Sequence, residues 1–235
     1  MNDTARQRAY YDRTADHYEA MHVRADDEHG QALARFADTA RRMGATSVLD
    51  VGGGTGRALE LLGAALPGVK LVGVEPSAAL RSVGHAKGIS EDALIHGSGE
   101  ALPFEDGAFD FVIETGMLHH VPEPAKVVAE MLRVARRGVM ISDSNKFAQG
   151  SKGLRLVKAL VDRLGLWKPF IWLQTRGRMA KWSEGDGVFY SYSVLDNFEQ
   201  VRARFPQIEL AATVPMTGSS LRRDAGHLCL IATSN

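Results

Sequence analysis

Short apolar runs alternate with helix-like patterns between residues 45 and 145. The apolar runs predict five strands, at 47–51, 70–74, 93–96, 109–113 and 138–142. The helix-like patterns predict helices between these strands, at 57–62, 77–86 and 123–135. Short apolar strands separated by helices are typical of a parallel sheet that is covered on both faces. We therefore expect an α/β core with a doubly wound arrangement.

The chain on either side of this core has a different pattern. Helical spacing predicts helices over residues 3–22 and 29–43, and Gly44 is suited to cap the second one. After residue 145 the alternation stops, and a helical, basic and aromatic-rich stretch extends to about residue 192. The last part predicts one helix and two strands that suit an antiparallel hairpin at the sheet edge, at 194–204, 208–214 and 227–233.

We expect all of these segments to form a single domain. The chain has 235 residues, of which 45% are hydrophobic, and this is enough for one α/β core. A lone cysteine, Cys229, excludes a disulfide scaffold. The parts of the domain are a helical cover, the core, an inserted lid, and a C-terminal helix with its hairpin, at 1–44, 45–145, 146–192 and 193–235. Because no signal-peptide core or membrane-spanning run is visible, we expect a soluble cytoplasmic protein.

The most informative segment lies between the first predicted strand and the helix that follows it. It reads Val-Leu-Asp-Val-Gly-Gly-Gly-Thr-Gly over residues 48–56. Glycines at such a turn let the backbone approach a ligand closely, and the start of the helix offers free N–H groups. A dinucleotide-binding pattern would need a small residue where Arg57 or Leu59 stands, and the Gly-Lys-Ser/Thr of a triphosphate-binding loop is absent. Both of these nucleotide classes are therefore excluded.

What remains is an acid followed by three alternate glycines, at Asp50, Gly52, Gly54 and Gly56. This spacing resembles motif I of the class I S-adenosylmethionine-dependent methyltransferases. Glu75 and Pro76 end the second predicted strand, and Leu-Pro-Phe at 102–104 and Leu-His-His-Val at 118–121 resemble later motifs of that family. The resemblance covers roughly residues 40–145. It is strongest to the small-molecule branch that includes the ubiquinone-biosynthesis methyltransferases.

The resemblance implies a Rossmann-like, seven-stranded and mostly parallel sheet in the order 3-2-1-4-5-7-6. It also implies S-adenosylmethionine as the cofactor and S-adenosylhomocysteine as the product. Glu75 would accept hydrogen bonds from the ribose hydroxyls, and Ser98 stands where the family often has an aspartate that faces adenine. Tyr11 and Tyr18 either cover the cofactor or pack within their helix. The residues expected at the cofactor are Asp50, Gly52, Gly54, Gly56, Glu75, Pro76, Ser98, Gly99, Glu100, Glu114, Tyr11 and Tyr18.

Methyl transfer in this family is an in-line displacement from a sulfonium, so the protein mainly positions the donor and acceptor and excludes water. Candidate catalytic residues follow the fourth and fifth predicted strands, at His120, His119 and Asp143. An imidazole can serve as a general base near neutral pH, and the family motif favours His120 over His119 for this role. The alternative is that one histidine packs under the helix and the other is solvated. Asp143 would contact the substrate.

The ends of the same two strands also carry side chains with oxygen atoms that could bind a metal. Glu114, Asp143 and Asn145 stand in places comparable to the magnesium ligands of catechol-type methyltransferases. Oxygen ligands suit magnesium, but the Asp-Ser-Asn spacing is not the adjacent pair that such a site has. We therefore expect no metal at this place.

The segment after the fifth strand has its own composition. Residues 146–181 hold nine Lys or Arg residues and one acid, a net charge of +8, in a chain whose formal charge is zero. Residues 147–198 hold nine of the 17 aromatic residues. The spacing of the apolar residues in the first part predicts a lid helix whose apolar face packs on the core and whose charges are solvated, with Leu154, Val157, Leu160 and Leu164 on the apolar face.

Three kinds of methyl acceptor fit this segment. An aromatic-lined pocket favours a small apolar or aromatic molecule, which we rank first. A basic amphipathic helix can make peripheral contact with an anionic membrane, which favours a lipid or quinone and ranks second. Nucleic acid ranks third, because no RNA-binding appendage is recognisable. A cofactor-binding regulator without turnover is the remaining alternative, since the glycine loop alone does not distinguish it from an enzyme.

Overall fold

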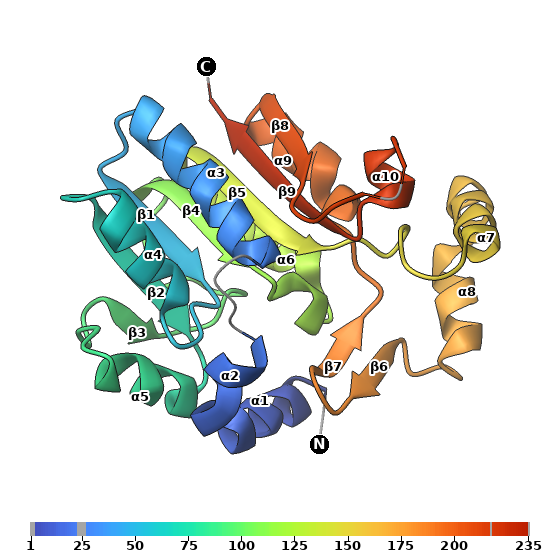
Figure 1. The fold of residues 1–235 in the computed structure, drawn as a ribbon, viewed down its shortest axis with the longest axis horizontal. Helices are drawn as coiled ribbons and strands as arrows, with labels where there is room; N and C mark the ends of the chain where they lie inside the picture. Colours follow the sequence, from blue (N-terminus) through green and yellow to red (C-terminus); the bar gives the residue numbers. More distant parts are fainter. Residues whose placement is uncertain (1–2, 23–26, 217, 235) are drawn as a thin grey trace.

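The computed structural model describes residues 3–22, 27–216 and 218–234. Its centre is a seven-stranded sheet with helices on both faces (Figure 1). The sheet strands are β1 (Ser47–Val51), β2 (Lys70–Glu75), β3 (Leu94–His96), β4 (Phe109–Thr115), β5 (Ala135–Ser144), β8 (Gln207–Ala212) and β9 (His227–Thr233). Their order is β3-β2-β1-β4-β5-β9-β8, and β9 runs antiparallel to both of its neighbours.

This sheet confirms the predicted fold class. When the strands of the sheet are numbered by themselves, β8 and β9 are the sixth and seventh, and the order is the expected 3-2-1-4-5-7-6. The parallel register pairs Val48 with Leu71 on one side of β1 and with Phe111 on the other. The carboxyl ends of β1, β2 and β4 therefore meet at one edge of the sheet.

Two strands outside the sheet correct the prediction for the inserted segment. We expected residues up to about 192 to be helical, but β6 (Ala180–Ser183) and β7 (Gly187–Tyr190) form an antiparallel hairpin. The physical reason is local. Valine, phenylalanine and tyrosine at 188–190 favour extended backbone, and Gly187 adopts a φ of +74° after the turn.

The helices around the sheet lie close to their predicted positions. They are α1 (Asp3–Thr14), α2 (Tyr18–His22), α3 (Glu28–Arg42), α4 (Arg57–Ala65), α5 (Ala78–Ala86), α6 (Pro124–Val134), α7 (Lys152–Arg163), α8 (Trp167–Gln174), α9 (Phe198–Arg204) and α10 (Leu221–Asp224). Short 3₁₀ turns occur at η1 (Ala15–His17), η2 (Leu118–His120) and η3 (Val194–Asn197). The expected helix at 3–22 is thus interrupted by η1, and the one at 194–204 begins as η3.

Two apolar clusters hold the helices on the sheet. On one face, α3 and α4 pack on β1, β4 and β5, with the ring of Phe36 edge-on to that of Phe111 at a centroid distance of 5.4 Å. On the other face, α6 and α9 pack on the same strands, with Met131 and Phe205 fully buried. The core thus fixes the positions of the strands whose ends carry the candidate site.

Strands β4 and β5 extend beyond the apolar runs that predicted them. Each extension contains a buried carboxylate, Glu114 in β4 and Asp143 in β5. The apolar pattern predicted that the strands end just before these residues. The Glu114 carboxylate accepts hydrogen bonds from the N–H groups of Ser142 (2.9 Å) and Met117 (3.1 Å). Because these bonds satisfy the buried carboxylate, the polar residue can be accommodated inside the sheet.

The N-terminal helices and the β6–β7 hairpin lie side by side over the carboxyl end of the sheet (Figure 1). The buried side chain of Gln7 joins them: its Nε2 donates to the carbonyl of Asp186 (3.1 Å) and its Oε1 accepts from the N–H of Val188 (2.6 Å). The Tyr10 hydroxyl also donates to the carbonyl of Glu184 (3.1 Å). These bonds fix the hairpin turn above the sheet edge.

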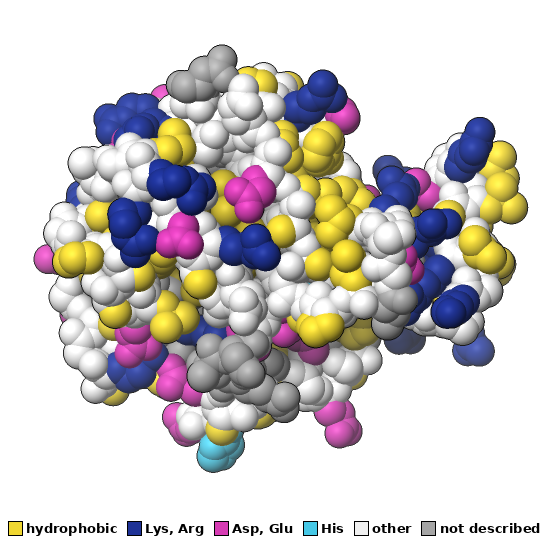
Figure 2. Space-filling model, turned by 45° about the horizontal axis from the view of Figure 1, so that its top comes forward, with side chains coloured by type: hydrophobic (Ala, Val, Ile, Leu, Met, Phe, Trp, Pro, Cys, Tyr) yellow, Lys and Arg dark blue, Asp and Glu magenta, His cyan; other side chains and the backbone are white. Residues whose placement is uncertain are grey.

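Helix α7 has the opposite orientation to the one predicted. Its leucines face outward, with Leu156, Leu160 and Leu164 respectively 62%, 58% and 59% exposed. The ammonium of Lys158 is instead turned inward and donates to the backbone carbonyls of Lys146 (2.7 Å) and Gln149 (3.1 Å). In Figure 2 the projecting lobe is dark blue toward the body and yellow on its outer side. The expectation that the apolar face packs on the core is therefore wrong.

No helix in the described ranges is long and apolar enough to cross a membrane.

Candidate active site

The glycine loop joins β1 to α4 and lies against the end of β2. Gly52, Gly54 and Gly56 have φ angles of +78°, +54° and +84°, which L side chains rarely adopt. The N–H groups of Gly52 and Gly53 both donate to the carbonyl of Val74 (2.9 and 3.1 Å). A Cβ added at Gly54 would lie 3.8 Å from the ring of Tyr18. The absence of side chains therefore keeps the space between loop and tyrosine open.

Glu75 is buried beside this loop at the end of β2. Its Oε2 accepts from the N–H of Gly54 (3.1 Å), and its Oε1 accepts from the N–H of Ser77 (2.7 Å). Burial raises the pKa of Glu75, and these two N–H bonds oppose that rise. The carboxylate and the glycine loop thus form one unit, as the sequence predicted for residues that bind a common ligand.

Two adjoining cavities open around this unit. The first has a volume of about 300 Å³, and its walls include Tyr11, Tyr18, His29, Asp50, Gly52, Gly54, His119, His120, Asp186 and His227. The second has a volume of about 120 Å³ and is lined by Glu75, Pro76, Leu80 and Met117 among others. Both cavities are bordered by Tyr11, Tyr18, Gly52 and Gly54. The two N-terminal tyrosines therefore cover the glycine loop.

Asp50 contributes an unsatisfied carboxylate to the first cavity. Its Oδ1 is buried and has no hydrogen-bond partner within the described part of the chain. Burial, with a smaller contribution from the charge of Glu75, raises the pKa of Asp50 to about 7. An acceptor atom that is buried without a donor is costly unless a ligand supplies one. This site is therefore suited to a ligand with a donor group, an ammonium above all.

Five other residues expected at the cofactor do not line these two cavities, namely Gly56, Ser98, Gly99, Glu100 and Glu114. Ser98 is exposed, and its hydroxyl accepts from the N–H of Glu100 (3.3 Å). Gly99 is buried below Met117, whose Cε would lie 3.4 Å from a Cβ at this glycine. Glu114 lies beneath the loop that it holds by hydrogen bonds. Direct cofactor contacts by these residues stay predictions.

His119 forms a close pair with a carboxylate of the fifth strand. Its Nδ1 lies 2.7 Å from Oδ1 of Asp143, whose Oδ2 accepts from the backbone N–H of His119 (3.1 Å). Burial alone would lower the pKa of His119, but Asp143 and Asp186 raise it to about 10. Burial would raise the pKa of Asp143, but His119 lowers it to about 2. Asp143 is fully buried and therefore orients His119.

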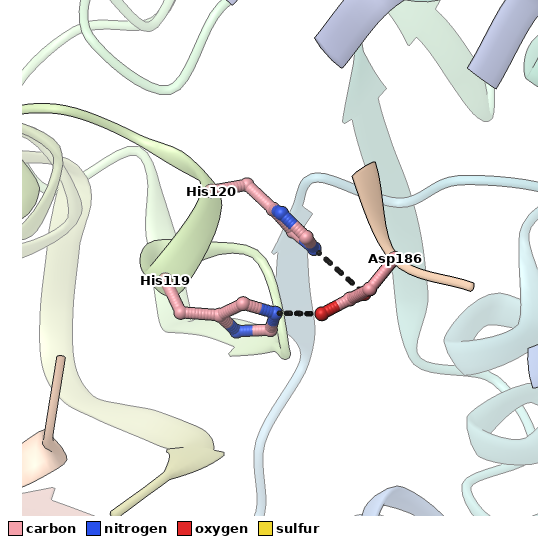
Figure 3. A group of neighbouring side chains, drawn as sticks. All are labelled: His119, His120 and Asp186. Carbon is pink, nitrogen blue, oxygen red and sulfur yellow. Dashed lines mark ion pairs between the residues drawn. The ribbon is translucent and has the colours of Figure 1, made fainter. Parts of the chain in front are cut away.

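His120 is held by the inserted hairpin. Its Nδ1 lies 2.6 Å from the carbonyl oxygen of Val188, and its ring meets that of Tyr11 edge-on at 5.8 Å. Its Nε2 is directed toward Asp186, as is that of His119 (Figure 3). Both histidines line the first cavity, and a catalytic role for either one stays a prediction.

Asn145, directly after β5, plays a different part from the histidines. Its Nδ2 donates to the carbonyls of Arg222 (2.9 Å) and Ala225 (2.8 Å), and its Oδ1 accepts from the N–H of Phe147 (3.2 Å). Because its amide is used in these bonds, Asn145 fixes the start of the insertion to the segment before β9.

Four residues of the site were missed by sequence reasoning. Asp186 and Gln7 depend on how the hairpin docks on α1, and no local pattern reports that contact. His29 and His227 line the first cavity with their rings 4.9 Å apart, although they come from α3 and β9. Burial lowers the pKa of both histidines, that of His227 to about 3. Both are therefore neutral hydrogen-bonding groups near neutral pH.

A third cavity of about 150 Å³ lies under the inserted segment. It shares His119, Ser144 and Asp186 with the first cavity. Its other walls combine aromatic or aliphatic side chains with lysines, among them Ile171, Phe189, Tyr192, Lys146, Lys158 and Lys181. The histidine and aspartate thus stand between the loop cavity and a basic, aromatic one.

Comparison with known proteins identifies relatives of the core. Residues 49–142 match a family described as a methyltransferase domain. An uncharacterised methyltransferase of Mycobacterium marinum is 40% identical over 93 residues, which are 39% of this chain and 36% of the relative. The matching stretch thus spans little more than a third of that relative's length.

Solved structures resemble nearly the whole chain. An S-adenosylmethionine-dependent methyltransferase from Thermotoga maritima has a TM-score of 0.60 at 14% identity, covering 97% of this chain and 99% of that one. Magnesium protoporphyrin IX methyltransferase from Synechocystis, solved with S-adenosylhomocysteine, has a TM-score of 0.60 at 17% identity and full coverage of both chains. At these identities the similarity demonstrates a shared fold.

Proposed function

We propose that this chain is a class I S-adenosylmethionine-dependent methyltransferase that methylates a small aromatic or apolar molecule bound under the inserted segment, since residues 49–142 match a methyltransferase-domain family. The single observation that carries the proposal is the joined unit of glycine loop, Glu75 and unsatisfied Asp50 beneath two tyrosines. When bound, the cofactor supplies a methyl group that is activated on a sulfonium.

The chain's own residues fit this cofactor in two ways. The unpartnered Oδ1 of Asp50 is suited to the ammonium of the methionine part of the cofactor. Because Gly54 has no side chain, the cofactor can approach the backbone of the loop there. Glu75 and Pro76 line the second cavity, where the carboxylate has lone pairs left for two ribose hydroxyls. Tyr11 and Tyr18 line both cavities, where they would shield a bound cofactor from water.

The third cavity supports this choice of acceptor. It lies across His119 and Asp186 from the glycine loop, so an acceptor bound in it would lie beside the cofactor cavity. Aromatic walls favour a flat or apolar acceptor. Lys146, Lys158 and Lys181 in the same walls favour an acceptor that also carries an acidic group. We propose cytoplasmic action, as expected for a small-molecule enzyme of this composition.

Replacing Glu75 by alanine tests the cofactor site. The change should weaken S-adenosylhomocysteine binding by ~1–3 kcal/mol, the usual loss for a buried charged hydrogen bond. Isothermal titration calorimetry measures this difference. The control is Glu91→Ala, which removes an exposed carboxylate from the loop before β3. Equal affinity for the wild type and Glu75→Ala would show that Glu75 has another role.

Asp50 predicts a pH dependence. Its folded-state pKa of about 7 lies above the ordinary value of 3.8, so its contribution to stability is greatest at low pH and is lost as the pH rises from about 4 to about 7. Asp50→Asn cannot ionise and should therefore lose less stability than the wild type between about pH 5 and pH 8. Saturating S-adenosylhomocysteine should reduce the difference, because its ammonium pairs with the carboxylate. Thermal unfolding across this range measures both effects, and parallel curves would contradict the assignment.

A membrane-bound lipid or quinone is the second candidate acceptor, and the outward apolar face of α7 favours it. Leu156, Leu160 and Leu164 are exposed on a segment that carries a net charge of +8. Helices with an exposed apolar face and many basic residues lie in the interface of anionic membranes. In that arrangement the inserted segment would contact the lipid surface next to the third cavity.

Vesicle sedimentation tests this second candidate. If it is correct, the wild type sediments with phosphatidylserine-containing vesicles, and salt weakens this binding. The double variant Leu156→Glu/Leu160→Glu should bind the vesicles roughly 10-fold or more weakly, because each substitution removes an apolar contact with the membrane. The control is Leu61→Glu, which changes an exposed leucine on α4. If the wild-type protein stays in the supernatant, the membrane-bound acceptor is excluded and the water-soluble acceptor remains.

A further inference from the structure

Three potential metal-binding atoms converge at the wall between the first and third cavities. They are Nε2 of His119, Nε2 of His120 and a carboxylate oxygen of Asp186, all within 4.8 Å of one another (Figure 3). Oδ2 of Asp186 lies 3.5 Å from the His119 nitrogen, and Oδ1 lies 3.4 Å from the His120 nitrogen. The histidines come from η2, whereas the aspartate comes from the turn of the β6–β7 hairpin.

The other nitrogen of each ring determines where its proton lies. Nδ1 of His120 faces the Val188 carbonyl oxygen at 2.6 Å, and a carbonyl can only accept, so this nitrogen carries the proton. Nδ1 of His119 faces the buried carboxylate of Asp143 at 2.7 Å and carries its proton for the same reason. In neutral rings, both Nε2 atoms therefore present lone pairs to Asp186. Such anchoring of the far nitrogen is typical of histidines that bind metals.

Lone pairs that face a carboxylate repel it unless a cation lies among them, and this cation is either a proton or a metal ion. Protons on both rings would create two cationic rings whose centroids are only 3.9 Å apart, which is electrostatically unfavourable. A proton on one Nε2 alone would be expected to draw that nitrogen to about 2.7–2.9 Å from a carboxylate oxygen. The separations are instead 3.5 Å from His119 to Oδ2 and 3.4 Å from His120 to Oδ1. They leave room for an ion that binds both nitrogens and the carboxylate.

We propose that His119, His120 and Asp186 bind a zinc ion. Three protein ligands leave a fourth position open, as in zinc sites that bind a substrate or water. This set differs from Glu114, Asp143 and Asn145, the residues whose positions in the sequence are comparable to magnesium ligands of catechol-type methyltransferases. Asp143 and the Val188 carbonyl orient the two imidazoles, and Gln7 holds the turn that carries Asp186. The site is therefore complete only when the hairpin is docked on α1.

The position of the ion suggests its use. The triad lines the first cavity, and His119 and Asp186 also line the third, so the open position lies next to a bound acceptor. Zinc lowers the pKa of a hydroxyl or thiol that coordinates to it, which makes such a group a better nucleophile at neutral pH. The binding of zinc itself does not depend on the proposed methyl transfer.

Zinc titration of untagged, chelator-treated full-length protein tests this proposal. In competition with a chromophoric chelator, the wild type should bind one equivalent of Zn²⁺. Asp186→Ala and His120→Ala should bind it roughly 100-fold or more weakly, because loss of even an outer partner costs about 10- to 100-fold. The control is His96→Ala, which removes an exposed histidine at the end of β3 and should bind as the wild type does.

Two further readouts separate this site from the cofactor site. Cobalt-substituted wild type should show the visible absorption of a tetrahedral site, and Asp186→Ala should lack it. Titration of the wild type with S-adenosylhomocysteine, measured in parallel, reports on the cofactor site, because zinc uptake by the chelator-treated protein is measured without that ligand. Wild-type protein that takes up no zinc, or an Asp186→Ala variant that binds zinc as tightly as the wild type, would overturn the proposal whatever the cofactor titration gives.

Discussion

Gly54→Val should abolish detectable binding of S-adenosylhomocysteine, a loss of roughly 100-fold or more. The added side chain would occupy the space between the loop and the ring of Tyr18, which a Cβ alone would approach to 3.8 Å. Valine is also strained at a φ of +54°, at a cost of about 1–3 kcal/mol. Steric exclusion and strain act together, so the effect should exceed that of Glu75→Ala. Calorimetric titration measures the affinity.

The matched control separates exclusion from strain. Gly68 has a φ of +84° between α4 and β2, and a Cβ there would meet nothing within 4 Å. Gly68→Val should therefore lower the melting temperature as Gly54→Val does, but retain the affinity for S-adenosylhomocysteine. Retained binding in Gly54→Val would contradict the placement of the cofactor at this loop.

Loss of either imidazole should cause the largest change in turnover. We expect His119→Ala and His120→Ala each to lower kcat by about 100-fold or more, whether the imidazoles act on the proton of the acceptor directly or hold the ion that does so. Both histidines line the first cavity, and His119 also lines the third. The measurement is S-adenosylhomocysteine formation with an acceptor that the wild type methylates.

Cofactor affinity distinguishes this effect from general damage. Both variants should bind S-adenosylhomocysteine within about threefold of the wild type, a difference below 1 kcal/mol. His120→Ala is the more secure variant, because His119→Ala leaves the buried Asp143 without its partner. Normal turnover in both variants would reduce the pair to packing residues. Binding without turnover on any acceptor, in the wild type itself, would instead favour a cofactor-binding regulator.

The sequence predicted the parts of the site that local patterns determine. The glycine loop and Glu75 are 21 residues apart, yet both follow neighbouring parallel strands, and such strand ends meet at one edge of the sheet. Alternating apolar strands and helices identified the parallel sheet, whereas its strand order came from the family resemblance. Glu114 and Asp143 were expected at the ends of the fourth and fifth strands, but their burial depends on the N–H groups of Ser142 and His119, which no apolar pattern reveals.

Long-range docking was beyond such patterns. Gln7 and Asp186 are 179 residues apart, and their contact depends on the hairpin that replaces the expected helix. The orientation of α7 was predicted wrongly because its amphipathic spacing is compatible with either face turned inward. Lys158 finds carbonyl acceptors at 146 and 149 on the body side, which favours the basic face there.

Titration of the wild-type protein with S-adenosylhomocysteine tests the central claim most directly. If Asp50, the glycine loop and Glu75 form an adenosyl-binding site, calorimetry should give saturable heat at one ligand per chain. The ligand should also raise the melting temperature, since it binds the folded state alone. A titration without heat, on protein shown to be folded, would contradict the account.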